Sequence, residues 1–210
     1  MPVARLGGTA GTFASSNSGS MSFSLPAGTD RLVAMISLHT TTTSVTSMTW
    51  KPDPGNPALN QPLTLVGRQV ASASGAVEIW ELANPTPGVV GAALSHTLSA
   101  NAKRVIGVHA LAGVGGHGTP AGAGIYGNAI SINVVSQPGA LVLDVLYGQN
   151  STTAHTAGAG QTMHWSLNAS GTNNLRGAGS SEAGAATTTM SWTSGAATHH
   201  ALLAVSYNPH

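Results

Sequence analysis

Short segments in which apolar side chains alternate with polar ones recur along the whole chain, separated by clusters of glycine, proline, asparagine and serine. Met21, Phe23 and Leu25 alternate with serines, which is typical of a strand with one buried and one solvated face. Residues 31–39 are apolar on both parities and predict a strand inside a sheet. Because no segment sustains a helical period, we expect an all-β protein with about ten to thirteen strands and less than about a tenth helix.

The length of 210 residues suits one large antiparallel β-sandwich. We expect a single sandwich domain over residues 20–210. Residues 1–19, nearly free of large apolar groups, predict an N-terminal arm or a first short edge strand. Residues 32–50 and 141–165 each run from an apolar strand through a threonine-rich turn to a tryptophan, but their spacings differ. They indicate at most the symmetry of a sandwich, not a solenoid.

Two stretches in the middle of the chain predict connections between strands. The apolar segments on either side of residues 100–102 read as a strand pair joined there. Residues 115–124 hold five glycines and predict a long loop, or a lobe that faces a ligand.

Charged residues make up only 6% of the chain, and seven basic residues against six acidic ones leave a formal charge of +1. The basic residues are scattered, whereas nucleic acids and anionic membranes require a basic stripe, so neither is expected as a partner. The absence of cysteine excludes disulfides and thiolate metal sites. No apolar run is long enough for a signal peptide or a membrane span, so we expect synthesis in a host cytoplasm.

Five segments taken together resemble a module that recurs in bacterial surface proteins and in the virion proteins of tailed phages. The resemblance covers most of residues 20–209 and implies a lectin-like, concanavalin-like β-sandwich with jelly-roll connections. It implies no catalytic residues. The segments are LPAGTDRLVAMISL, VEIWELANP, GALVLDVLYGQ, GAGSSEAGAATTTMSWT and HHALLAVSYNP.

The strongest suggestion of catalysis is the pair Glu78 and Glu81, because lectin-like sandwiches include β-glucanases with two glutamates on one strand. In those enzymes an aspartate stands between the glutamates, where this chain has Trp80. Residues three apart on a regular strand face opposite sides, and a retaining glycosidase needs its carboxyl groups about 5 to 5.5 Å apart. Serine-nucleophile and phosphate-loop motifs are also absent, so we expect no enzymatic activity.

Asp144 shares a face with apolar neighbours, so its carboxylate is predicted to be buried. Its structural interpretation is an ion pair with Arg31 or Arg104, or hydrogen bonds to backbone amides. The functional alternative is an oxygen ligand for Ca²⁺ or for a sugar hydroxyl. The six acidic residues form no loop site for calcium, and the nine histidines show no metal-binding spacing, so no metal or cofactor is expected.

Aromatic residues are scarce, at 4% of the chain, and we expect most of them to fill the core. In a carbohydrate-binding module some would instead be exposed stacking platforms. Tyr126, set among small residues, is the best candidate for an exposed ring. Tyr126, Asp144 and Trp80 are therefore the candidate ligand-binding residues.

Two functions fit these features. The first is a structural protein of a phage virion, either a capsid-decorating or a tail-associated subunit, which forms homo-oligomers and attaches to other virion proteins. The nearly uncharged surface supports this hypothesis, because few charges are available to protect edge strands from pairing. The alternative is a lectin-like carbohydrate-binding or adhesin domain that binds cell-surface glycans.

Overall fold

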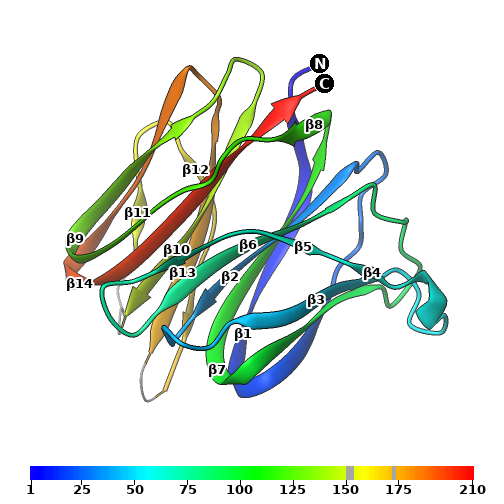
Figure 1. Cartoon of the computed structure of the whole chain (residues 1–210), viewed down its shortest axis with the longest axis horizontal. Coiled ribbons are helices and arrows are strands. Elements are labelled where there is room, and N and C mark those ends of the chain that lie inside the picture. The colour runs from blue at the N-terminus through cyan, green and yellow to red at the C-terminus, as the bar shows by residue number, and fades with distance from the viewer. Residues whose placement is uncertain (150–153, 172–173) are drawn as a thin grey trace.

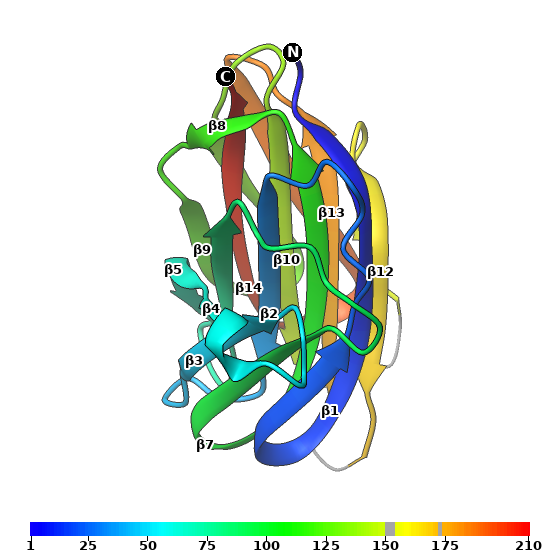
Figure 2. The same cartoon turned by 90° about the vertical axis from the view of Figure 1, so that its right-hand side faces the viewer.

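The computed structural model describes residues 1–149, 154–171 and 174–210, and nearly all of them lie in antiparallel β-structure (Figure 1). The 3-10 helix η1 (Pro57–Leu59) is the only helix in these three ranges, and none there is long and apolar enough to cross a membrane. Two sheets pack against each other, which confirms the predicted β-sandwich (Figure 2). The jelly-roll or concanavalin-like connections stay a prediction.

Each half of the chain supplies one sheet of seven strands. The first sheet contains β1 (Ala4–Ser22), β2 (Arg31–Leu38), β3 (Val45–Lys51), β4 (Gln61–Pro62), β5 (Thr64–Val70), β6 (Ala76–Ala83) and β7 (Ala93–Ala112). The second contains β8 (Val114–His117), β9 (Ala121–Val135), β10 (Leu141–Gln149), β11 (Thr156–Ala157), β12 (Thr162–Ala169), β13 (Leu175–Ala183) and β14 (Thr187–Pro209). The count exceeds the predicted range because β4 and β11 are too short to show a pattern.

Apart from β4 and β8, which have no counterpart in the other sheet, the two sheets share one strand order. In the first, β7 pairs with β1 on one side and with β2 and β3 on the other, and β6 and β5 follow β2. In the second, β14 pairs with β9 on one side and with β10 and β11 on the other, and β13 and β12 follow β10. The chain is thus built from two structural repeats. The repeat seen in the sequence matches at β2 and β10 but not at its tryptophans, because Trp50 lies in β3 and Trp165 in β12.

Strand β2 is apolar on both parities because both faces of its sheet are covered. Val33 and Met35 belong to the core between the two sheets, together with residues of β10. Leu32 and Ile36 point the other way, into a second core closed by β3, by the second half of β1 and by the first half of β7. The first sheet curls over itself to form this second core (Figure 2).

Two predicted connections are wrong. Residues 100–102 are not a turn, because β7 runs through them as one strand that pairs with β1 before and after its bend. Residues 115–124 are not a long loop, because they contain most of β8 and the start of β9. A Cβ atom at Gly124 would meet the carbonyl oxygen of Val70 in β5. Glycine is needed there so that β9 can lie against the edge of the other sheet.

The N-terminal segment, expected as an arm or a short edge strand, forms most of the 19-residue strand β1. It pairs with β7 of its own chain, and β7 is its only ladder partner among the described residues. The other side of β1 is therefore an edge of the first sheet.

Candidate functional site

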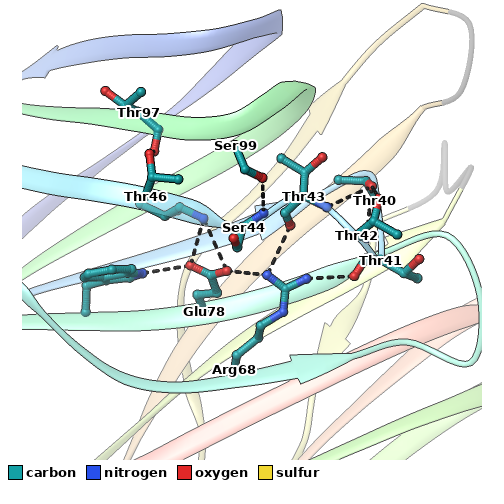
Figure 3. Close-up of polar contacts among 12 residues, drawn as sticks. Thr40, Thr41, Thr42, Thr43, Ser44, Thr46, Arg68, Glu78, Thr97 and Ser99 are labelled. Carbon is teal, nitrogen blue, oxygen red and sulfur yellow. Dashed lines mark hydrogen bonds and ion pairs between the residues drawn. The ribbon is translucent and has the colours of Figure 1, made fainter.

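Glu78 in β6 is the centre of a buried polar cluster inside the curled sheet (Figure 3). Its carboxylate accepts hydrogen bonds from Arg68 Nη1 at 2.6 Å, from Trp80 Nε1 at 2.9 Å and from the backbone N–H of Val45 at 3.4 Å. These donors surround the carboxylate and compensate for its burial. The cluster therefore holds strands β3, β5 and β6 together.

Arg68 extends the cluster to the loop between β2 and β3. Its Nη2 donates to the carbonyl oxygen of Thr41 at 2.8 Å, and its Nη1 donates to that of Thr43 at 3.1 Å (Figure 3). Within the loop, Thr40 Oγ1 accepts from the backbone N–H groups of Thr42 and Thr43. The Arg68 guanidinium thus holds the loop through its carbonyl groups. The polar groups that the loop presents to solvent are hydroxyl groups.

Glu81 lies on the opposite face of β6, as the spacing predicted. Its Oε1 accepts from Arg31 Nη1 at 2.8 Å, and both side chains are largely buried. The two glutamates are therefore held by different arginines on different faces of one strand. Because Arg31 pairs with Glu81, the alternative pairing of Arg31 with Asp144 is wrong.

Asp144 in β10 is completely buried on the outer face of the second sheet. Its Oδ1 accepts from the backbone N–H and the hydroxyl of Ser180, both at 2.8 Å, and its Oδ2 accepts from Trp192 Nε1 at 2.7 Å. Gln161 Nε2 also donates to Oδ2, at 3.2 Å. The predicted bond to a backbone amide is confirmed. Burial raises the pKa of Asp144 to about 6, although these hydrogen bonds oppose the shift.

Arg104, the other arginine expected to pair with Asp144, lies instead at the bend of β7. Its guanidinium donates to His96 Nε2 at 2.6 Å and to backbone carbonyl oxygens between residues 14 and 18 of β1. The register between β1 and β7 shifts twice in that segment, so Arg104 binds carbonyl groups where the ladder is irregular. The sequence gives no signal for this role, because Arg104 and residues 14–18 are far apart along the chain.

All four tryptophans are buried, as expected for core residues. Trp80, one of the three candidate ligand-binding residues, is only 9% exposed and donates its Nε1–H to Glu78. A ring in this position cannot act as a stacking platform for a ligand from solvent.

Tyr126 in β9 is 65% exposed, and its ring lies beside His199 of β14 with a centroid distance of 4.9 Å. His199 Nδ1 is 2.6 Å from the hydroxyl of Ser72, which belongs to the turn between β5 and β6. Tyr126, His199 and Ser72 thus form one surface patch across the seam between the two sheets. Of the three candidate residues only Tyr126 is accessible, and the fold does not bring it together with Trp80 and Asp144.

The histidines occur partly in pairs. His155 Nε2 and His200 Nε2 lie 3.1 Å apart in a buried contact, and the rings of His109 and His164 are 5.1 Å apart. Burial lowers the pKa of His155, His164 and His200 to about 4. In the described part of the chain no three histidine, aspartate or glutamate side chains lie close enough to hold a metal ion.

Comparisons with known proteins give no relative for this chain: no family model, no curated protein and no solved structure matches it.

Proposed function

We propose that the chain is a structural subunit of a phage virion, capsid-decorating or tail-associated, which acts by self-assembly and by attachment to other virion proteins. The feature that carries the assembly part is the 19-residue edge strand β1. It contains no proline, no lysine and no acidic residue, and its single charged side chain, Arg5, is directed to His109 Nδ1 at 2.7 Å. An exposed edge without these defences is a template for pairing with another chain.

The second sheet supports the same proposal. Its edge strand β9, the counterpart of β1 in the second repeat, contains neither a charged residue nor proline. Each sheet therefore has a long edge strand with no more than one charged residue. The virion setting rests on the resemblance of the five sequence segments.

The test is light scattering on the purified chain from low salt to roughly molar salt, with mass spectrometry of purified particles. Edge pairing and apolar contacts are insensitive to salt, so we expect an oligomer across the whole range. A monomer at all concentrations, or dissociation at modest salt, would contradict self-assembly. Absence of the chain from particles would contradict the virion assignment.

A lectin-like or adhesin function is the second candidate, and the Tyr126 patch favours it. An exposed ring flanked by an imidazole and a hydroxyl can stack on a sugar ring and form hydrogen bonds with its hydroxyl groups. Binding on a glycan array that is lost in Tyr126→Ala would support this function at this patch.

A further inference from the structure

A groove of about 460 Å³ lies between the two ends of β9, and neither Tyr126 nor the cluster around Glu78 lines it. One wall is formed by residues 118–121, which connect β8 to β9 and include the first residue of β9, and the other by the end of β9 and the residues after it. Asn208 of β14 completes the lining. This volume lies in the range of small-molecule sites, which is about 300 to 1,000 Å³.

Both walls are attached to one buried residue, Ser206 of β14. Its carbonyl oxygen accepts from the backbone N–H of Gly118 at 2.8 Å, and its hydroxyl lies 2.8 Å from that of Ser136. The Ser206 hydroxyl donates to Asn208 Oδ1 at 2.9 Å. Because hydrogen bonds to the buried Ser206 hold each side, the groove is part of the folded sheet rather than a gap between loose turns.

The lining presents oriented amide donors. Asn208 Oδ1 accepts from Ser206, and Asn133 Oδ1 accepts from Thr189 Oγ1 at 2.8 Å, so the NH₂ group of each side chain is left for a ligand. Gln137 adds a third carboxamide, and Val135, which is 80% exposed, adds an apolar surface. No lining residue in the described part of the chain is ionisable.

We infer that this groove binds a short neutral saccharide. Carboxamides hydrogen-bond the hydroxyl and ring oxygens of such a ligand, Val135 and Pro120 contact its apolar C–H face, and the absence of lining charges disfavours acidic sugars. The inference rests on the second candidate function and assigns it a site other than the Tyr126 patch. It does not depend on assembly.

The experiment is a glycan array of neutral and sialylated oligosaccharides with the full chain, followed by calorimetric titration of the strongest neutral binder. Asn133→Leu and Gln137→Met preserve side-chain size and remove the amide, and both positions are exposed. We expect each to weaken the affinity about tenfold, the cost of one net hydrogen bond. Asn128→Leu, on the same strand outside the groove, is the matched control and should bind as the wild type does.

Each alternative outcome overturns a defined part of the inference. No binding to any oligosaccharide on the array, neutral or sialylated, would overturn both the groove site and the second candidate function. Binding lost in Tyr126→Ala but unchanged in Asn133→Leu and Gln137→Met would overturn the groove and leave that function at the Tyr126 patch. Preference for sialylated glycans would overturn the neutral specificity.

Discussion

Arg104 Nε lies 2.6 Å from His96 Nε2, and both side chains are buried where β7 bends. His96 must accept this bond at Nε2, so its proton is on Nδ1. The Phe13 ring packs against both groups, with the guanidinium 4.9 Å from its centroid and the imidazole 5.0 Å away. All hydrogen-bond acceptors described for this cation are neutral, so its charge is balanced by carbonyl dipoles and an aromatic ring.

Arg104→Ala should therefore destabilise the fold strongly, because it removes a buried guanidinium and leaves several buried or partly buried carbonyl groups without this donor. We expect the free energy of unfolding in urea to fall by roughly 3 kcal/mol or more. The matched control is Lys103→Ala, the neighbouring cation, whose bond to the Ser170 carbonyl is exposed. It should cost about 1 kcal/mol or less. Equal losses in the two variants would show that Arg104 does not hold the bend.

Stability should fall in acid because the fold lowers the pKa of four histidines by partial or complete burial. Burial lowers the pKa of each from 6.5 to about 4, so the unfolded chain binds protons more readily than the folded chain between these values. The contribution of these groups is complete above pH 6.5 and is lost as the pH falls through about 4. Urea midpoints across this range should decrease toward acid. The residues are His96, His155, His164 and His200.

Protonation of Asp144 should change the stability with pH in the opposite direction to the histidines. Its folded-state pKa is raised from 3.8 to about 6, so the stability linked to its proton is present below 3.8 and is lost as the pH rises through 6. Asp144→Asn removes this opposing change. Between about pH 4 and 6 the variant should therefore gain stability more steeply with pH than the wild type, by a total on the order of 3 kcal/mol. Parallel curves for the two proteins would contradict the raised pKa.

Trp165 fills the space between the two sheets because two glycines leave room for its indole. A Cβ atom at Gly107 of β7 or at Gly179 of β13 would overlap the ring. We expect Gly107→Ala to cost roughly 1–3 kcal/mol, measured by urea or thermal unfolding. Gly116→Ala is the control, since its Cβ would meet nothing within 4 Å, and it should change stability by about 0.5 kcal/mol or less. A tolerated Gly107→Ala would mean that Trp165 can move.

Self-assembly through the β1 edge should be sensitive to charge placed on that strand. Thr12→Lys and Ser20→Lys introduce charges at exposed positions of β1 and should shift the light-scattering mass toward the monomer. Thr97→Lys adds the same charge at an exposed position of β7, which has neighbours on both sides, and should leave the oligomer intact. If all three variants dissociate alike, net charge rather than edge pairing controls assembly.

β-Glucans should not be hydrolysed, because the Glu78 carboxylate is enclosed by its donors and Glu81 faces the other side of the strand. A retaining mechanism needs both carboxyl groups to flank the same glycosidic bond. Turnover of a β-glucan that is lost in Glu78→Gln or Glu81→Gln would contradict this expectation.

The alternation of residue types predicted the fold class correctly because each strand exposes one face to a core. It predicted the two-sided burial of β2 from the apolar run at residues 31–39 for the same reason. It failed at β7 and β9, where small and flexible residues imitate turns. At residues 100–102 the pairing of β1 keeps the strand continuous, and at Gly124 the approach of β5 requires a residue without a side chain. Both causes are tertiary contacts that local composition does not contain.

The candidate residues were predictable only in part. The exposure of Tyr126 and the buried state of Asp144 follow from their immediate neighbours in the sequence. The groove does not, because its walls and Asn208 come from segments whose proximity depends on the curvature of β9 and β14. Nothing in the sequence distinguishes Ser206, which holds the walls, from the other serines. Its role is evident only from the arrangement of the strands.

The position of β7 and β14 at the end of their repeats has a consequence for synthesis of the chain. A ribosome releases β1 first, but its partner is complete only at residue 112 of 210. In the second half, β9 is likewise synthesised before its partner β14 is complete. Pairings between distant segments fold slowly, and a strand without its partner is open to wrong partners. The interval between the release of β1 and of β7 is therefore the stage at which the nascent chain is most vulnerable to mispairing.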